Sequence, residues 1–193
     1  MSGAVAGPDG KLRCPWGMSA PEYIAYHDKE WGKRIRTDKG LYERMTLEAF
    51  QSGLSWLTIL RKREGFRKAF DGFELETVAA YGPKDVERLL ADAAIVRNRA
   101  KIEAAIRNAN AALALEGGLA KLLWSFAPDP KGRPAPKTLG DVPPLTDESK
   151  AMAKELKRRG FAFVGPTTAY ALMQAAGLVD DHLVDCHARR KEK

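Results

Sequence analysis

The sequence contains no apolar run that approaches the roughly 20 residues of a membrane-spanning helix. Its first residues, MSGAVAGPDGKL, lack the successive charged, apolar and cleavage-site regions of a secretory signal peptide. Cysteine is scarce, because only Cys14 and Cys186 occur among 193 residues. These absences argue against a membrane protein and against a disulfide-stabilised secreted protein. They predict a cytoplasmic location in which both thiols stay reduced.

Segments in which apolar and polar side chains alternate every second residue are also almost absent, which argues against a β-sheet protein. Apolar residues instead recur at intervals of three and four, and strong helix formers dominate. The sequence therefore predicts an all-α fold. The expected helices cover residues 21–27, 38–52, 56–70, 74–80, 83–92, 97–115, 119–126, 147–159 and 166–176.

Local signals mark the ends of several expected helices. Gly53 and Gly177 follow periodic apolar runs, where a residue in the left-handed conformation is expected. Pro166 occupies a first helical position, and Ser55 is expected to cap the helix that begins at Trp56. These signals fix where the chain leaves one helix and enters the next.

The length of the chain is ample for one sizeable hydrophobic core, and residues 13–187 are predicted to form a single domain. Residues 1–12 are expected to be a flexible leader and residues 188–193 a basic tail. Residues 127–146 hold six of the eleven prolines, so they are expected to lack regular structure. Such a connection either divides two lobes or wraps the surface as a structured loop.

The chain is basic, with a net charge of +7 and an isoelectric point near 9.4. A basic surface favours polyanions such as DNA or RNA. Many soluble proteins are mildly basic, however, so the charge alone does not identify a partner.

Both cysteines and two of the three histidines fall into two pairs, one near each end of the chain. Cys14 precedes His27 by thirteen residues, and His182 precedes Cys186 by four. Two thiolates and two imidazoles suit tetrahedral zinc, and four protein ligands leave no open position for catalysis. Neither pair has a zinc-finger spacing, so two interpretations remain open. The residues form a structural zinc site that joins the chain ends, or they are buried free thiols beside hydrogen-bonded histidines.

The residues next to the two histidines are acidic. Asp28 and Asp181 are expected to orient the rings of His27 and His182 by accepting hydrogen bonds from them. His187 is expected to lie outside the metal site.

The stretch LEAFQSGLSW carries one carboxylate, Glu48, on the same helical face as Leu41 and Met45. An acid on an apolar face indicates a buried site. The alternative is an exposed carboxylate paired with Arg44, four residues earlier. Trp56 lies just beyond this helix. The residues alone do not show whether the Trp56 side chain forms a binding surface or packs in the core.

Several motifs occur in a fixed order from residue 13 to about residue 186. They are RCPWG, YIAYHDKEWG, LEAFQSGLSWLTILRKRE, DVERLLADAAIVRNRAKIEAAIRNA, LLWSF, LKRRGFAFVGPTTAYALMQAAGLVDDH and the closing His182-x-x-x-Cys186. Taken together, they resemble the type I 3-methyladenine DNA glycosylase family of bacterial base-excision repair enzymes.

The resemblance implies a helix-hairpin-helix glycosylase fold whose N- and C-terminal segments are joined by a structural zinc ion. The zinc ligands it implies are Cys14, His27, His182 and Cys186. The base pocket it implies consists of Trp16, Tyr26, Glu48 and Trp56, with Tyr23 and Trp31 nearby. The implied reaction is hydrolysis of the N-glycosidic bond to N3-methyladenine, which leaves an abasic site.

The implied partner is double-stranded DNA that contains alkylated adenine, bound by a bacterial cytoplasmic monomer at the nucleoid, without a nucleotide cofactor. A flipped-out base would stack on the tryptophans, and Glu48 would pair with its positive charge. We find neither the catalytic aspartate nor the Schiff-base lysine of other superfamily members, so a monofunctional glycosylase is expected.

The stretch AIVRNRAKI aligns with the family's DNA-binding hairpin. Arg97, Asn98, Arg99 and Lys101 are expected to contact the DNA backbone. Ala94 and Ala100 stand where glycines are common, which leaves the geometry of the turn open. Three alternatives remain: a glycosylase of broader alkylpurine range, a module that binds damaged or abasic DNA without cutting it, and a zinc-containing interaction protein.

Overall fold

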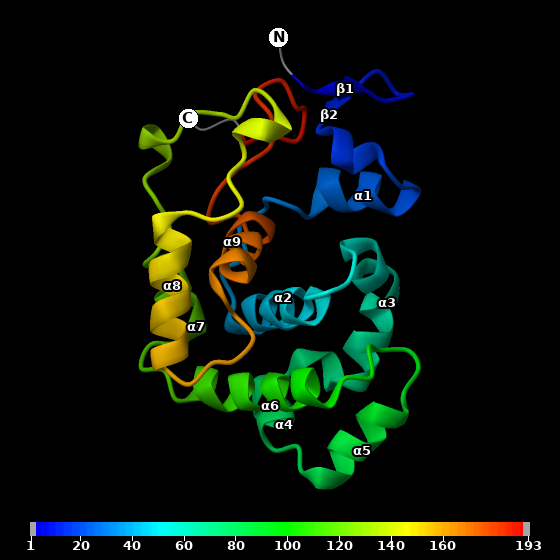
Figure 1. Ribbon diagram of the computed structural model, residues 1–193, viewed down its shortest axis with the longest axis vertical. Coiled ribbons are helices and arrows are strands. Elements are labelled where there is room, and N and C mark those ends of the chain that lie inside the picture. Colours follow the sequence, from blue (N-terminus) through cyan, green and yellow to red (C-terminus); the bar gives the residue numbers. More distant parts are fainter. Residues whose placement is uncertain (1–2, 191–193) are drawn as a thin grey trace.

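Nine α-helices make up most of residues 3–190, the part of the chain that the computed structural model describes (Figure 1). They are α1 (Pro21–Lys29), α2 (Asp38–Gln51), α3 (Trp56–Ala69), α4 (Leu75–Ala79), α5 (Pro83–Ala91), α6 (Arg99–Leu113), α7 (Gly118–Trp124), α8 (Asp147–Arg158) and α9 (Pro166–Ala175). Short 3-10 helices are η1 (Pro15–Met18), η2 (Asp71–Phe73), η3 (Pro130–Gly132) and η4 (Leu139–Asp141). The expectation of a mainly helical protein is confirmed, and every expected helix is present.

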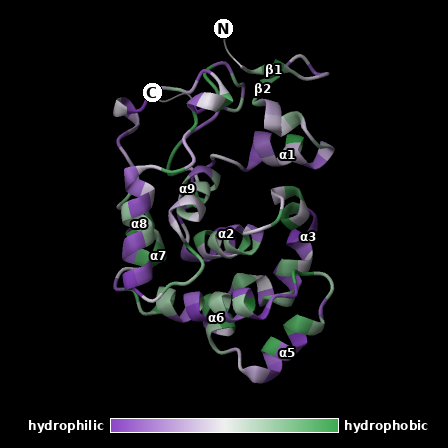
Figure 2. Ribbon diagram, viewed as in Figure 1, coloured by the Kyte–Doolittle hydropathy of each residue, from purple (hydrophilic) through white to green (hydrophobic). Residues whose placement is uncertain are grey.

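Helix α2 lies at the centre of the molecule. It packs against α3, α6, α7 and α9, and almost all its residues from Leu41 to Phe50 are buried. Figure 2 shows the contrast with α8, an outer helix that is largely hydrophilic. Because this part of α2 is covered on nearly every side, a buried charged residue between Leu41 and Phe50 faces an internal cavity or an internal partner.

The link from α2 to α3 follows the expected local signals. Gly53 has a φ of 80°, the left-handed conformation that glycine adopts without a steric penalty. The Ser55 hydroxyl accepts a hydrogen bond of 3.2 Å from the backbone amide of Thr58, which caps the first turn of α3. This tight link places Trp56 close behind the end of the helix that carries Glu48.

The first residues of the chain differ from the flexible leader expected for them. From Val5 to Arg13 they form a small antiparallel hairpin of two strands, β1 (Val5–Ala6) and β2 (Leu12–Arg13). The buried Arg13 guanidinium binds Asp9 at 2.7 Å and Asp28 at 2.7 Å, so burial of this arginine orders the hairpin against α1. Residues 1 and 2 lie outside the described part.

The start of the expected basic tail also packs on the domain. Ala188 is buried, Arg189 donates to the carbonyl of His182 at 2.7 Å, and Arg190 donates to the carbonyl of Gly177 at 2.7 Å. The remaining tail, residues 191–193, lies outside the described residues.

The proline-rich connection, residues 127–146, runs over the surface as a structured loop. Apart from η3 and η4 it has no regular structure, as expected. One hydrophobic cluster includes residues from both sides of it, among them Phe50 before the connection and Met152 after it. The connection therefore borders a single core. No helix within residues 3–190 has the length and hydropathy needed to cross a membrane.

The turn between α5 and α6 spans residues 92–98. Neither Ala94 nor Ala100 has a positive φ, so this turn does not require glycine at either position. Glycine is required instead on the facing helix, since a Cβ on Gly65 would lie 2.5 Å from the Ala94 carbonyl oxygen. The turn therefore packs closely on α3, and its backbone conformation accommodates alanine at positions 94 and 100.

Lys101 departs from its expected role as a DNA contact. Its residue is only 8% exposed, and its ammonium donates to the backbone carbonyls of Phe50, at 2.9 Å, and Ser52, at 2.5 Å. The end of α2 leaves carbonyls without helical partners, and Lys101 satisfies two of them. The expectation that Lys101 contacts DNA is wrong in this structure, because the side chain points into the protein.

Replacement of Lys101 by methionine should lower the free energy of unfolding by about 2–4 kcal/mol, since two carbonyls would lose charge-assisted hydrogen bonds. Urea unfolding of Lys101→Met measures this loss. Lys84→Met is the matched control, because Lys84 is exposed on α5 and should change stability by less than about 0.5 kcal/mol. Equal stability of the two variants would contradict the role given to Lys101.

Candidate active site

Six residues singled out in the sequence line one cavity of about 520 Å³. They come from four elements: η1, α1 with the turn after it, the second half of α2, and the first position of α3. These residues are Trp16, Tyr23, Tyr26, Trp31, Glu48 and Trp56. The structure thus brings the whole expected base pocket together.

The aromatic rings of the cavity hold one another in place. Trp16 meets Trp31 edge to face, with centroids 4.9 Å apart, and meets Tyr23 in the same way at 5.8 Å. Tyr26 and Trp56 lie 5.4 Å apart with their planes tilted by 44°. Rings fixed in this way offer a rigid surface to a planar ligand. The buried Nε1 of Trp56 has no hydrogen-bond partner within the described chain, so it is available to a ligand.

Glu48 is the acidic group of the cavity. It is 6% exposed, and within residues 3–190 no hydrogen bond or salt bridge reaches its carboxylate. Burial raises the pKa of Glu48 to about 7, although attraction to Arg44 opposes the shift. The carboxyl group therefore ionises near neutral pH, and a positively charged ligand would stabilise its ionised form.

The alternative of an exposed Glu48–Arg44 salt bridge is wrong. The guanidinium of Arg44 donates to the Tyr26 hydroxyl at 3.2 Å and lies 3.5 Å from the Glu30 carboxylate. Glu30 also binds Arg63 at 2.5 Å, which fixes this group beside α1 and α3. Arg44 thus orients Tyr26 and leaves Glu48 free to face the cavity.

The structure adds cavity residues that the sequence did not reveal. Gln51 is one helical turn beyond Glu48, and Ala171 and Gln174 are three apart on α9, so helical spacing could have suggested them. The others carry no periodic signal, because they lie in loops or, for Leu139, in a single 3-10 turn. These additional residues are Ser19, Leu139, Val142 and Asp181.

Asp181 has a different role from the one expected. It accepts hydrogen bonds from Gln174 at 2.9 Å and from Tyr170, and it forms a salt bridge of 2.6 Å with Arg133. The residue that orients His182 is Asp180, whose carboxylate lies 2.7 Å from the ring Nδ1. Adjacency in sequence did not determine which aspartate faces the histidine.

A second cavity of about 440 Å³ adjoins the first and shares Glu48, Gln51 and Ala171 with it. Leu54 lies on its edge and is 42% exposed. The left-handed Gly53 precedes it. An apolar side chain is therefore held outward directly beside the aromatic cavity.

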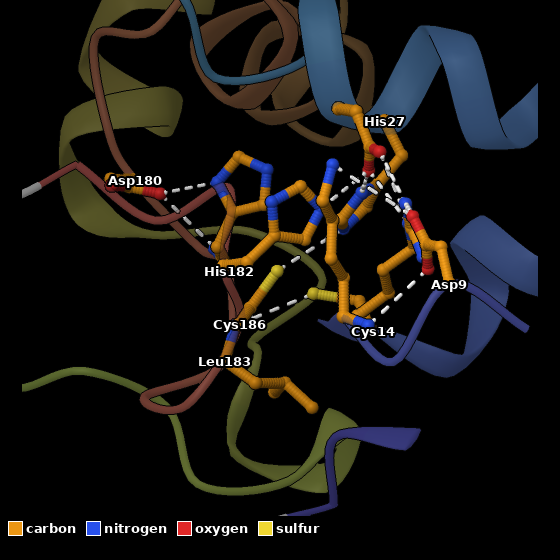
Figure 3. A network of polar contacts seen from close by, with 11 residues as sticks. Asp9, Cys14, His27, Asp180, His182, Leu183 and Cys186 are labelled. Atoms are coloured by element: carbon orange, nitrogen blue, oxygen red, sulfur yellow. Dashed lines mark hydrogen bonds and ion pairs between the residues drawn. The ribbon is translucent and has the colours of Figure 1, made fainter. Parts of the chain in front are cut away.

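Cys14, His27, His182 and Cys186 converge where the two ends of the chain meet (Figure 3). The ligand atoms of Cys14, His27 and Cys186 all lie within 4.8 Å of one another. The ring of His182 packs edge to face on that of His27, with centroids 4.9 Å apart. The contact between the thiols raises the pKa of Cys14 and lowers that of Cys186, so one sulfur atom readily becomes a thiolate.

Both histidine rings are oriented through Nδ1, which leaves Nε2 for the cluster. Asp28 lies 2.8 Å from Nδ1 of His27. The Nε2 atom of His182 is buried without a hydrogen-bond partner in the described chain. An orphaned nitrogen beside two thiols is the arrangement expected of a metal ligand.

Two glycines allow this packing. A Cβ on Gly17 would lie 2.7 Å from Cγ of His27, and a Cβ on Gly32 would lie 2.7 Å from Cε1 of His182. Gly32 also has a φ of 77°, which other residues rarely adopt. His187, expected to lie outside the site, contacts Asp28 at 3.0 Å and so borders the cluster.

The cluster and the aromatic cavity share a wall. The ring of Trp16 lies 5.1 Å from that of His27, and the ring of Trp31 lies 4.7 Å from that of His182. Displacement of either histidine would therefore move an aromatic side chain of the cavity.

The residues expected to contact DNA divide into different roles. Arg97 is exposed and has no ion-pair partner within residues 3–190. Asn98 caps α6 by accepting a 3.1 Å hydrogen bond from the amide of Lys101, and Arg99 forms an exposed salt bridge of 2.6 Å with Glu87. Of the four, Arg97 is therefore the freest to bind a phosphate.

Comparison with known proteins gives a consistent result. A family model described as methyladenine glycosylase matches residues 16–190. DNA-3-methyladenine glycosylase 1 of Escherichia coli is 47% identical over 177 residues, which cover 90% of this chain and 95% of that protein. The corresponding protein of Haemophilus influenzae is 45% identical over 180 residues, covering 90% of this chain and 96% of that protein.

Solved structures agree with the sequence comparison. A 3-methyladenine DNA glycosylase I from Staphylococcus aureus, studied for its recognition of 3-methyladenine, superposes with a TM-score of 0.87 at 37% identity. The match covers 94% of this chain and 98% of that one.

The raised pKa of Glu48 predicts a pH-dependent stability. Burial favours the protonated form of Glu48 in the folded protein. The free energy of unfolding is therefore highest below about pH 4.5, where Glu48 is protonated in both states, and it decreases as the pH rises through 7. At about pH 8, Glu48→Gln should therefore exceed the wild type in free energy of unfolding by about 3 kcal/mol.

Urea unfolding of both proteins near pH 5 and near pH 8 measures the effect. The gain from Glu48→Gln should be small at the lower pH, and the exposed Glu76→Gln on α4 should show no such gain at either pH. A gain that is equal at both pH values would show that Glu48 has an ordinary pKa.

Proposed function

This chain belongs to the methyladenine glycosylase family, and from that premise we propose that its aromatic cavity receives N3-methyladenine flipped out of duplex DNA. The protein is a DNA-3-methyladenine glycosylase of DNA repair, which hydrolyses the N-glycosidic bond of the damaged nucleotide. The observation that carries the assignment of the site is Glu48, a buried carboxyl group that has no hydrogen-bond or ion-pair partner within residues 3–190 and lies among aromatic rings.

Charge supplies the selectivity of the site. A buried carboxylate among aromatic rings is costly unless it is paired, and an N3-methylated adenine in DNA is a cation. Pairing would lower the pKa of Glu48 again and stabilise its ionised form. Aromatic faces also attract a cationic base more strongly than a neutral one. Normal adenine lacks the N3 methyl group and the charge that it brings, so it cannot offset the desolvation of Glu48.

The reaction needs little from the protein beyond binding and electrostatic stabilisation. The electron pair of the bond between the sugar C1′ and the base N9 leaves with the base, which becomes neutral. Water adds to C1′ and releases a proton to solvent. The amine of Lys101, in the first turn of α6, is held by two backbone carbonyls, which supports a monofunctional glycosylase without a Schiff-base amine.

We assign DNA backbone binding to α5, residues 92–98 and α6, as a helix-hairpin-helix element. The first turn of α6 offers backbone amides to a phosphate, and the exposed Arg97 beside it adds a positive charge. Leu54 lies at the rim next to the base cavity, where an exposed apolar side chain suits the gap left by a flipped base.

We also propose that Cys14, His27, His182 and Cys186 bind a structural zinc ion. Two sulfur and two nitrogen donors suit tetrahedral zinc, and the unpartnered Nε2 of His182 supports the assignment. When bound, the ion would tie the N-terminal segment to the C-terminal one without an open position for catalysis. Asp28 and Asp180 lie within hydrogen-bond distance of Nδ1 on the two rings, which favours the tautomer that leaves each Nε2 for the metal.

The function of Glu48 predicts a specific loss. Glu48→Gln keeps the shape of the side chain but removes its charge, so release of 3-methyladenine from methylated duplex DNA should fall by roughly 10²-fold. Single-turnover assays with chromatography of the released base measure the rate. Glu76→Gln, an exposed glutamate on α4, should retain the wild-type rate. Normal release by Glu48→Gln would remove Glu48 from recognition of the base.

The zinc assignment predicts about one zinc ion per chain, measured by elemental analysis of the purified protein. Cys186→Ser and His182→Asn should each lose the metal and several kcal/mol of stability, whereas His187→Gln should keep the metal. A wild-type protein that is fully stable without metal would refute the site.

A further inference from the structure

The proline-rich connection contributes two apolar side chains to the base cavity. Leu139, the first residue of η4, and Val142, just after it, both line the cavity. Val142 is half-buried, but Leu139 is 45% exposed. A side chain that lines a cavity and stays this exposed lies at its rim.

The backbone around Leu139 is firmly held. The amides of Lys137 and Thr138 both donate to the Asp141 carboxylate, at 3.0 and 2.8 Å. The Lys137 carbonyl accepts a hydrogen bond of 2.7 Å from the amide of Gly3, in the N-terminal segment. The position of Leu139 is therefore fixed by short contacts on both sides of it.

Two further contacts join the connection to the segment after α9. The amide of Val184 donates to the Pro136 carbonyl at 2.8 Å. Arg133 forms a salt bridge of 2.6 Å with Asp181, which itself lines the cavity. The connection is thus one wall of the site.

From this placement we propose that Leu139 contacts the substrate and packs on the deoxyribose of the flipped-out nucleotide. The interior of the cavity, with its aromatic rings and Glu48, suits the planar cationic base. At the rim, the nucleotide presents its sugar, whose CH groups suit an apolar side chain. A phosphate would instead call for a basic or amide donor. The inference rests on the proposed function of the cavity.

The experiment compares Leu139→Ala with Leu113→Ala. Leu113, at the end of α6, is also 45% exposed but does not line the cavity, so it controls for the loss of an exposed leucine. Two quantities are measured for each: kcat/KM for base release from methylated duplex DNA, and the Kd of free 3-methyladenine from quenching of tryptophan fluorescence.

For Leu139→Ala we expect kcat/KM to fall by about tenfold, because the sugar loses an apolar contact. The Kd of the free base should stay within about twofold of the wild type, since the free base has no sugar. Leu139→Met should restore most of the rate, and Leu113→Ala should match the wild type in both quantities.

Wild-type base release by Leu139→Ala would overturn this inference while leaving the proposed function intact. An equal loss of affinity for the free base would also overturn it, because Leu139 would then act on the base cavity. A wild-type protein that releases no 3-methyladenine would overturn the proposed function itself, and this inference with it.

Discussion

The packing of the two chain ends against each other is the constraint on which the site depends. His27 from α1 and His182 from the segment after α9 are in ring contact, and each also touches a tryptophan of the cavity. Gly17 and Gly32 leave room for these two rings, because a Cβ atom at either position would clash with a histidine. The aromatic wall is therefore positioned by contacts near the termini, although the acid that it surrounds belongs to the central helix.

Glu48 illustrates how a site can oppose the stability of its own fold. An apolar side chain at a buried helical position usually stabilises the fold. Position 48 instead carries an acid, and desolvation raises the pKa of this acid to about 7. The fold tolerates the acid because the surrounding core is extensive and continuous. In the proposed function, recognition of a cation thus depends on an ion pair that Glu48 lacks in the free protein.

The helices could be predicted because their signals are local: Ser55, Gly53 and Pro166 act on neighbouring backbone groups. The six cavity residues could be named because their motifs resembled a known family. Lys101 was misplaced, because its burial depends on how α6 meets the end of α2. Leu139 was missed for a similar reason, since an irregular connection has no periodicity that reveals which side chain faces inward.

The cavity is assembled from residues between Trp16 and Asp181, and its aromatic wall rests on His182. Contacts between segments so distant in sequence form late, after the local helices. During synthesis, the segment from Trp16 to Trp56 can form its helices early, but the cavity stays incomplete until Ala171, Gln174 and Asp181 have been added. Synthesis of residues 171–182 therefore precedes completion of the cavity, and a fragment that stops before them lacks part of its lining and the ring that supports Trp31.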